Sequence, residues 1–508
     1  MWSPWKEIFL VCLSILLLIF SFPRFDIELL AWISLVPLLI AIKDKNLKYS
    51  FGLCFITGIG FFMGLFYWIN EVNAFKWVDF ILSGVYLSFY TGLFGLTFRF
   101  IANKTKISPV VTAPVLWVSL EYLRSHAGFF GVPWALLGHS QYLNLPIIQI
   151  SSLTGVYGVS FLIVMVNATL SELLQNRFRI FKPALITLII LVISFGYGFS
   201  VLSKDIGLDD KVTITLIQGN IPQDIKWKPE FLKQNFDKHV WLTTEASNRN
   251  KSSLIVWPEG SVPGPLRHDL YFLNAISTLA RETETPLLIG SSEYPKFGSR
   301  EFRSQNWYNS AYLVSPKAGI ERQYNKIYLL PFAEYRPYKD SFPWPSRYVS
   351  RGGDFIPGNE YTIFNISGSK FGVVICWESI FPELFRQFVR EGAQFMVNIT
   401  NEAWFGKTAA PYQFVSMNVF RAVENRVSIA RSANTGISCF IDPFGRIMDK
   451  VMDHHNDIFV EGYLMGQVPL SREKTFYTIY GDIFVYLNMA MAISILILSC
   501  WRMRNRLG

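Results

Sequence analysis

The sequence predicts an α-helical membrane domain joined to a layered α/β domain outside the cytoplasm, and three observations support this fold class. The chain has 508 residues, of which 51% are hydrophobic, and its mean hydropathy of +0.27 is too high for an ordinary soluble protein. Long apolar runs fill residues 7–202 and return at 483–501. Between these runs, strand-like segments alternate with amphipathic helical segments, which is typical of layered α/β domains.

The apolar runs predict about eight membrane spans. Seven lie in the first part of the chain, at residues 7–23, 28–42, 51–70, 79–98, 108–123, 156–173 and 183–202, and the eighth lies at 483–501. Several are shorter than the roughly 20 residues that a helix needs to cross a bilayer. No small-residue cleavage site follows the first span, so we expect an uncleaved anchor.

The basic residues predict the orientation of these spans. With a cytoplasmic N-terminus, most of the lysines and arginines between spans fall in cytoplasmic loops, as the positive-inside rule requires. These cytoplasmic residues are Lys43, Lys45, Lys48, Arg99, Lys104, Lys106, Arg177, Arg179 and Lys182, whereas the opposite loops carry mainly Arg24, Lys76 and Arg124. The chain thus divides into a seven-span membrane domain at 1–204, an extracytoplasmic domain at 205–475, and a last span with a basic cytoplasmic tail at 476–508.

Several classes of function are disfavoured by the composition. The net charge of +9 suggests nucleic acid binding, but many of the basic residues flank hydrophobic spans. The five cysteines include no C-x-x-C pair, the six histidines are scattered, and the GKT at 406–408 lacks the upstream glycine of a P-loop. We therefore expect no nucleic acid partner, no metal site and no cofactor.

The region 205–475 contains nine predicted strands and four predicted helices. The strands are placed at residues 212–218, 253–257, 286–291, 308–315, 372–375, 394–399, 427–433, 437–441 and 457–462, and the helices at 229–246, 268–283, 381–391 and 411–426. This number of strands exceeds what one simple doubly wound sheet usually carries. Two sheets sandwiched between helices fit the pattern better.

Three residues at predicted strand ends form a chemically coherent set. Cys376 ends the buried run at 372–375, Glu259 follows the strand at 253–257, and Lys326 lies among aromatic and aliphatic residues. Glu259 can take the thiol proton, and Lys326 can stabilise both a thiolate and an oxyanion, with the main-chain N–H of Trp377 as a second oxyanion donor. Each residue also has an ordinary structural reading, as a core cysteine, a solvated turn glutamate or a surface lysine.

The segments around these residues resemble a known family. WPEG around Glu259, YNKIYLLPFAEYRP around Lys326 and ICWES around Cys376 resemble the Glu-Lys-Cys motifs of the nitrilase superfamily of carbon–nitrogen hydrolases. The chain as a whole, with its membrane spans, resembles the apolipoprotein N-acyltransferases of bacterial inner membranes. Three further segments agree with this family: QGNIPQDIKW at 218–227, NITNEAWFG at 398–406 and RAVENRVSIARSANTGIS at 421–438.

The resemblance implies a nitrilase-like αββα sandwich on the periplasmic side of the inner membrane. It also implies ping-pong acyl transfer, in which Cys376 takes an acyl chain from a phospholipid as a thioester. The acceptor is the α-amine of an apolipoprotein's N-terminal S-diacylglyceryl-cysteine. Glu259 is then the general base and Lys326 the transition-state stabiliser. Glu334, Trp377 and Glu378 are supporting residues, although Trp377 replaces a tyrosine of many members, and Glu402 replaces a common aspartate.

An aromatic arm follows the Lys326 motif. It carries Tyr338, Phe342 and Trp344 among prolines and glycines, and we expect it to form a lid and a lipid entrance. Aromatic residues also concentrate at membrane interfaces, so simple interfacial anchoring is an equal alternative.

Two other functions compete with acyl transfer to lipoproteins. A membrane-tethered amidase of the nitrilase type would use water on the same thioester. A non-enzymatic transporter or scaffold would need ionisable residues along an intramembrane path, and these are scarce in the predicted spans. The eight spans beside the site favour a lipid substrate over a water-soluble amide.

Overall fold

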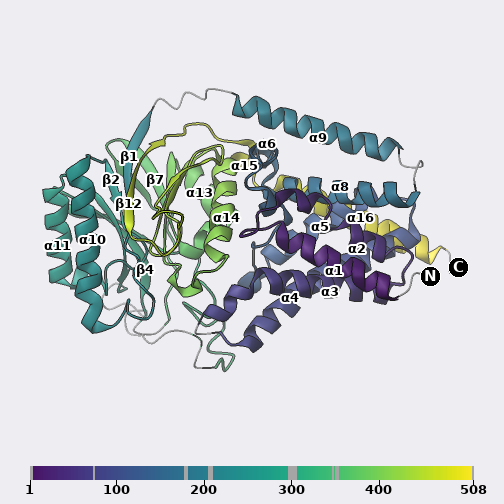
Figure 1. The fold of residues 1–508 in the computed structure, drawn as a ribbon, viewed down its shortest axis with the longest axis horizontal. Helices are drawn as coiled ribbons and strands as arrows, with labels where there is room; N and C mark the ends of the chain where they lie inside the picture. The colour runs from purple at the N-terminus through teal and green to yellow at the C-terminus, as the bar shows by residue number, and fades with distance from the viewer. Residues whose placement is uncertain are drawn as a thin grey trace. The chain divides into compact units, whose positions relative to one another are not determined.

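The computed structural model describes residues 4–72, 75–176, 181–203, 210–295, 306–345, 348 and 354–505. The chain divides into two compact units, shown in Figure 1. A helical unit comprises residues 1–70, 75–204 and 480–508, and an α/β unit comprises residues 71–74 and 205–479. The predicted boundary between residues 204 and 205 lies outside the described residues.

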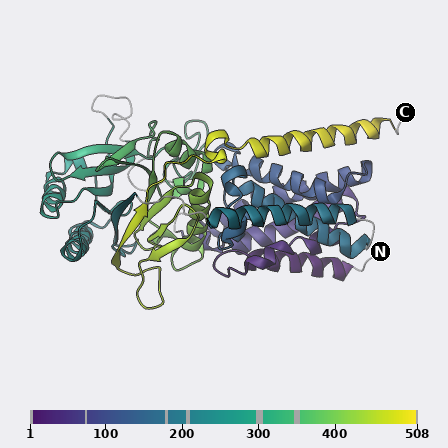
Figure 2. The same ribbon diagram turned by 90° about the horizontal axis from the view of Figure 1, so that it is seen from above.

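The helical unit is a set of long helices whose axes run in similar directions (Figures 1 and 2). Its helices are α1 (Pro4–Phe20), α2 (Val36–Ala41), α3 (Leu47–Leu65), α4 (Trp77–Lys104), α5 (Pro109–Ser125), α6 (Leu145–Ile148), α7 (Ser151–Thr154), α8 (Val156–Asn176), α9 (Phe181–Leu202) and α16 (Ile483–Arg504). Short 3₁₀ turns lie at η1 (Glu28–Trp32), η2 (Tyr67–Glu71), η3 (Gly128–Phe130) and η4 (Leu137–Gln141).

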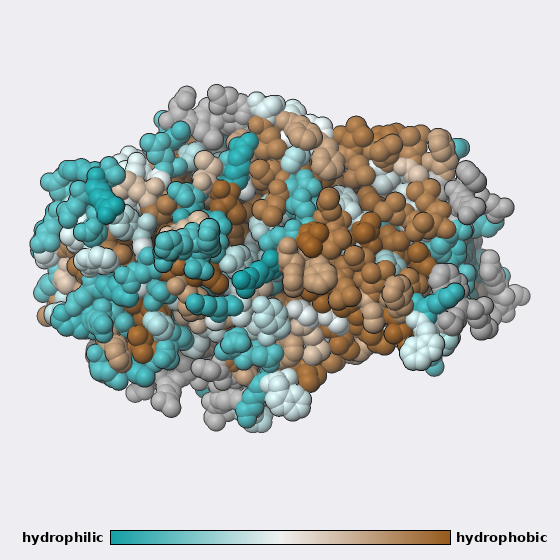
Figure 3. Space-filling view, viewed as in Figure 1, coloured by the Kyte–Doolittle hydropathy of each residue, from teal (hydrophilic) through white to brown (hydrophobic). Residues whose placement is uncertain are grey.

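Five of the described helices are long and apolar enough to cross a membrane: α3, α4, α8, α9 and α16. On the visible face, hydrophobic residues cover most of the helical unit's surface (Figure 3). Helices α1 and α5, with 17 residues each, are shorter than these five. The segment predicted as a span at 28–42 is interrupted in the structure, where it folds as η1 followed by the six-residue helix α2.

A polar residue from a distant helix explains the break between η1 and α2. Asn167 of α8 is fully buried, and its Oδ1 accepts hydrogen bonds from the N–H groups of Leu35 (2.7 Å) and Val36 (3.1 Å). Its Nδ2 donates to the carbonyl oxygen of Ala31 at 2.9 Å. These bonds satisfy backbone groups that a continuous helix would pair internally, so the interruption is stable in an apolar environment.

The α/β unit contains two six-stranded sheets. The first has the strand order β12-β1-β2-β3-β4-β5, and the second has the order β11-β10-β9-β8-β7-β6. The strands of the first sheet are β1 (Lys211–Gln218), β2 (Leu254–Val256), β3 (Leu287–Glu293), β4 (Tyr308–Ser315), β5 (Gly319–Asn325) and β12 (Gly462–Pro469). Those of the second are β6 (Ile363–Ile366), β7 (Ser369–Ile375), β8 (Phe395–Thr400), β9 (Ser428–Ala433), β10 (Cys439–Ile441) and β11 (Ile447–Lys450).

Helices cover the outer face of each sheet, giving four layers (Figure 1). Helices α10 (Pro229–Arg249) and α11 (Leu270–Glu282) pack on the first sheet through a buried cluster that includes Phe236, Trp257 and Ile276. Helices α13 (Pro382–Arg390) and α14 (Ala410–Asn425) pack on the second sheet. The sheets face each other, and Ser432 of β9 donates to the Ile217 carbonyl of β1 at 2.9 Å. The sandwich of two sheets between helices is therefore confirmed.

Both sheets have a parallel centre. Strands β1, β2 and β3 run parallel in one sheet, as do β7, β8 and β9 in the other. The carboxyl ends of these strands are where open α/β sheets place ligands. A strand predicted at 457–462 is wrong, since β12 begins at Gly462, and the structure adds β5, β6 and β11 to the prediction.

Candidate functional site

Glu259 lies in a tight turn just after β2. The turn depends on Gly260, whose φ of +57° is the left-handed conformation that favours glycine. The neighbouring strand β3 approaches the turn closely at Gly290, where an added Cβ would lie 2.7 Å from Glu259 Cα and 2.7 Å from the Pro258 oxygen. Two glycines therefore permit the backbone path that positions the Glu259 carboxylate.

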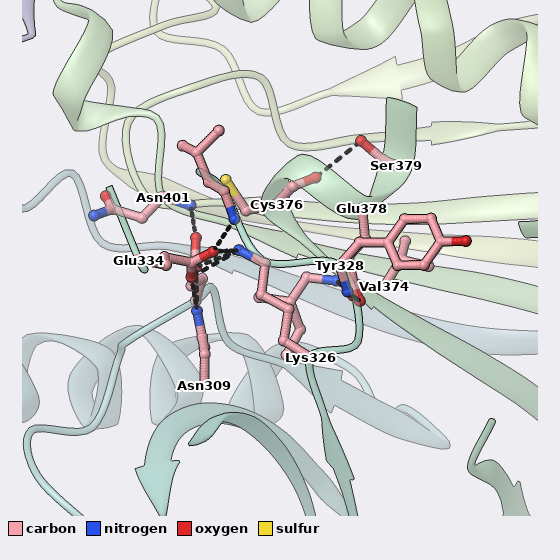
Figure 4. A network of polar contacts seen from close by, with 12 residues as sticks. Asn309, Lys326, Tyr328, Glu334, Val374, Cys376, Glu378, Ser379 and Asn401 are labelled. Atoms are coloured by element: carbon pink, nitrogen blue, oxygen red, sulfur yellow. Dashed lines mark hydrogen bonds and ion pairs between the residues drawn. The ribbon is translucent and has the colours of Figure 1, made fainter. Parts of the chain in front are cut away.

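Lys326 follows the last residue of β5, and its ammonium is almost completely buried. Its Nζ lies 2.8 Å from Glu334 Oε2 and 3.9 Å from Glu259 Oε1. Asn309 of β4 links the two carboxylates, because its Nδ2 donates to Glu259 Oε1 at 2.8 Å and to Glu334 Oε1 at 3.0 Å. One lysine thus faces two carboxylates in a compact network, which Figure 4 shows from close by.

Cys376 directly follows β7 and starts the 3₁₀ turn η6 (Cys376–Ile380). Its φ of +52° is uncommon for a non-glycine residue and costs on the order of 1–3 kcal/mol. The residue is half-buried, and it lies at the edge of the network of Lys326 and Glu334 (Figure 4). Backbone strain of this kind is frequent where a fold orients a functional side chain.

Glu378 joins the elements that carry Lys326 and Cys376. Its buried Oε1 accepts hydrogen bonds from Tyr324 Oη (2.7 Å), Ile327 N (2.7 Å) and Tyr328 N (3.0 Å), which flank Lys326. Its Oε2 accepts from the N–H of Ile375 at 2.7 Å, the residue before Cys376. Burial raises the pKa of Glu378 to about 7, although these hydrogen bonds and the nearby Lys326 charge lower it in part.

The charges of the site determine the protonation of its thiol. Burial raises the pKa of the Cys376 thiol, the Glu259 carboxylate raises it further, and Lys326 offsets only part of this shift. Burial lowers the pKa of Lys326, but its attraction to Glu334, Glu259 and Cys376 outweighs burial, so that its net pKa lies above the ordinary value. At neutral pH the resting site therefore contains a neutral thiol and a charged lysine, and the thiol needs a base to become a nucleophile.

A second hydrogen-bond network reaches Glu259 from the other sheet. The N–H of Asn401, just after β8, donates to Glu259 Oε2 at 2.8 Å. Asn434 is fully buried, and its Nδ2 donates to Asn401 Oδ1 (2.9 Å) and to the Ile221 oxygen (2.7 Å). Its Oδ1 accepts from the Ile221 N–H at 2.9 Å. This network connects the 218–227, 398–406 and 421–438 segments to the Glu259 carboxylate.

The roles of Asn309, Asn401 and Asn434 are additional to those of the site residues predicted from the sequence. All three lie in predicted strands or in segments that resemble the family, but their partners are far away in the chain. Glu402, which follows Asn401, forms a fully buried ion pair with Arg431. Among the described residues, no group of three or more His, Cys, Asp and Glu side chains is arranged to hold a metal ion.

The remaining predicted site residues lie around this centre. Trp377 is half-buried, and its ring meets the Phe381 ring edge-on with centroids 5.4 Å apart. Tyr338 and Phe342 are 72% and 51% exposed. The Trp344 ring packs against the rings of Phe342, Phe332 and Tyr348, with centroids 4.2, 4.9 and 6.4 Å away.

Comparisons with known proteins agree with this architecture. Residues 14–169 match the family described as apolipoprotein N-acyltransferase N-terminal domain, and residues 213–475 match the family described as carbon-nitrogen hydrolase. The chain is 38% identical to an apolipoprotein N-acyltransferase of Geobacter metallireducens, over 96% of this chain and 94% of that protein. Proteins of the same name from Chlorobaculum tepidum (27% identical, 96% and 95% covered) and Haemophilus influenzae (29%, 93% and 91%) are also similar. These similarities confirm the resemblance predicted from the sequence motifs.

Proposed function

The chain belongs to the apolipoprotein N-acyltransferase family, and from this premise we propose that it moves an acyl chain from a phospholipid to an apolipoprotein. The acceptor is the α-amine of the N-terminal S-diacylglyceryl-cysteine, as in the last step of lipoprotein maturation. The observation that carries the proposal is the meeting of Glu259, Lys326 and Cys376 at the carboxyl ends of strands from two sheets. We propose Cys376 as nucleophile, Glu259 as general base and Lys326 as stabiliser of the transition state.

In the first half-reaction, Glu259 takes the proton of the Cys376 thiol, and the thiolate attacks the ester carbonyl carbon of the phospholipid. Negative charge then develops on the carbonyl oxygen, and the fixed positive charge of Lys326 stabilises it. The tetrahedral intermediate collapses as the glycerol oxygen leaves with the proton from Glu259. The products are a lysophospholipid and a Cys376 thioester. The raised pKa of the thiol supports this order, because the thiolate forms only when a base is in place.

In the second half-reaction, the α-amine of the acceptor attacks the thioester carbonyl carbon. Glu259 takes a proton from the amine, and the carbon–sulfur bond breaks to give an amide. Cys376 leaves as a thiolate and regains its proton from Glu259. Glu334 and Glu378 support both steps by position: Glu334 holds the Lys326 ammonium, and Glu378 joins the backbone flanking Lys326 to the residue before Cys376.

The spans and their orientation belong to the same proposal. We propose eight spans, a membrane domain at 1–204, a catalytic domain at 205–475 on the periplasmic side of the bacterial inner membrane, and a last span within 476–508. The five described helices that are long enough to cross a membrane support a multi-pass chain. The bias of the basic residues toward one set of loops supports the orientation.

The first test is the intact mass of the purified full chain after exposure to vesicles of phosphatidylethanolamine and phosphatidylglycerol. We expect an increase of one fatty-acyl group that maps to Cys376 and leaves when a diacylglyceryl-cysteine peptide is added. Cys376→Ala should show no increase. The alternative, a membrane-tethered amidase or hydrolase, predicts an acyl group that is lost equally fast without the peptide. No increase with either lipid would refute the acyl-enzyme mechanism.

We propose further that the arm carrying Tyr338, Phe342 and Trp344 is a lid over the lipid entrance. The exposure of Tyr338 and Phe342 supports contact with lipid, and the packing of Trp344 in the arm gives that segment a defined shape. Replacing Phe342 and Trp344 together by alanine should slow acyl-enzyme formation from vesicles more than from a short-chain phospholipid in solution. Equal rates with both donors would leave interfacial anchoring as the role of the arm.

A further inference from the structure

Lys226 is a buried cation that the proposed chemistry does not use. It belongs to the 218–227 segment, just before α10, and it is only 5% exposed. Among the described residues, no carboxylate forms an ion pair with its ammonium. A buried charge without such a partner is costly to the fold, and functional sites are where such charges concentrate.

The Lys226 side chain is directed at the turn that carries Glu259. Its Nζ donates a hydrogen bond to the Glu259 carbonyl oxygen at 2.9 Å, and it lies 5.4 Å from the centroid of the Trp227 ring. Gly260 makes room for this contact, since an added Cβ would lie 2.9 Å from the Trp227 ring and 3.6 Å from Lys226 Cε. The lysine therefore holds the turn through the main-chain oxygen of Glu259, and its charge also attracts the Glu259 carboxylate.

The charges of the reaction centre are unbalanced without Lys226. Glu259 and Glu334 share one amide nitrogen of Asn309 and face one cation, Lys326. Repulsion between two carboxylates favours protonation of one of them, and a protonated Glu259 cannot act as a base. Lys226 is the second cation at this centre, so the two carboxylates are matched by two lysines.

The other titratable groups nearby do not supply this balance. Burial, with a smaller contribution from the charge of Lys226, lowers the pKa of His239 in α10 to about 4. The His239 ring is therefore neutral. Glu402 is paired with Arg431, and the Cys376 thiol is neutral at rest. Burial lowers the pKa of Lys226 to about 8, against the attraction of the Glu259 carboxylate, so that the lysine is charged at neutral pH.

We propose that Lys226 is a positioning residue that holds the Glu259 turn and keeps Glu259 in the carboxylate form, which accepts the thiol proton. This inference rests on the proposed role of Glu259 as general base. It predicts that Lys226 determines how far the pH can be lowered before the rate of reaction at Cys376 falls. Losing its charge should move this limit to higher pH, whereas the rate at alkaline pH should change much less.

The test measures the reactivity of Cys376 against pH in the full chain in detergent. The rate of alkylation by iodoacetamide, followed at Cys376 by peptide mass, needs no lipid, and the rate of acylation by phosphatidylethanolamine vesicles is measured beside it. Lys226→Met removes both charge and hydrogen bond, Lys226→Gln retains a hydrogen-bond donor, and Lys226→Arg retains the charge. Lys228→Met, at an exposed lysine two positions away, is the matched control.

We expect both neutral variants to move the pH of half-maximal rate upward by about one unit, the scale of a nearby opposite charge. Lys226→Arg and Lys228→Met should keep the wild-type midpoint. Melting temperatures are measured for both neutral variants, because Lys226→Met also removes the hydrogen bond to the Glu259 carbonyl oxygen. A wild-type midpoint in both neutral variants would overturn the inference. Failure of the wild-type chain to acylate would instead refute the proposed function, while the alkylation profile would still test Lys226.

Discussion

A single added methyl group at Gly290 should displace Glu259 without changing its side chain, and so test how much the proposed reaction depends on its position. In Gly290→Ala the new Cβ would lie 2.7 Å from Glu259 Cα, 2.7 Å from the Pro258 oxygen and 2.8 Å from the Gly260 nitrogen. All three atoms belong to the backbone, so no side chain can swing aside. Ordinary contact begins at 3.4 Å, so the turn must move by about 0.7 Å.

The expected cost follows from this displacement. Misplacing a reacting group by about 1 Å can reduce a rate by roughly 100-fold, so we expect acyl-enzyme formation in Gly290→Ala to fall by roughly 10- to 100-fold. Overpacking a buried site typically costs about 1–3 kcal/mol, so the folded domain should persist with a modestly lower melting temperature.

The assay is the rate at which the Cys376 acyl-enzyme forms with phospholipid vesicles, measured by intact mass together with thermal melting. Gly52→Ala in α3 is the matched control, because its added Cβ meets no atom within 4 Å. This control should keep the wild-type rate and melt no lower, since alanine is the better helix former. A folded Gly290→Ala chain with the wild-type rate would show that the turn tolerates displacement and would refute the reasoning.

Two other perturbations address the networks around the centre. Asn434→Ala would leave the Ile221 N–H, the Ile221 oxygen and Asn401 Oδ1 without their bonds, and at about 1–3 kcal/mol per buried group the free energy of unfolding should fall by at least ~3 kcal/mol. Asn365→Ala, at an exposed position of β6, should cost less than about 1 kcal/mol in the same denaturant titration. The folded-state pKa of Glu378 is raised from 4.5 to about 7, so its contribution to the free energy of unfolding should decline as pH rises through this window. Glu378→Gln does not titrate and should lack this slope, and parallel slopes in thermal melts from pH 4.5 to 7 would contradict the shift.

Local signals in the sequence were sufficient to place the reactive side chains at strand ends. An apolar run that stops at a turn marks both the strand and its carboxyl end, and this reasoning located Glu259 after β2 and Cys376 after β7. The helices of the α/β unit were also predictable, because amphipathic periodicity is a local property. Helix α13, for example, begins at Pro382 and buries Leu384, Phe385, Phe388 and Val389 on one face.

Features that depend on distant partners were not predictable in this way. Strand β5 has a largely exposed or half-exposed pattern, since it lies at a sheet edge and lacks the apolar run of a central strand. Strand β12 was placed too early, because its pairing with β1, far away in the chain, determines its register. The break at 33–35 is stabilised by Asn167, and Glu259 is bound by Asn401. Neither contact leaves a trace near its own position in the sequence.

Because the site is divided between two sheets, it is complete only when both sheets of the α/β unit have formed and packed together. Glu259 and Lys326 follow strands of one sheet, whereas Cys376 follows a strand of the other. A chain in which only one sheet has formed holds either Glu259 and Lys326 without Cys376, or Cys376 without Glu259 and Lys326. In the proposed mechanism, such a half-folded chain would lack the base that the Cys376 thiol requires. The proposed acyl transfer therefore requires the two sheets to be packed against each other.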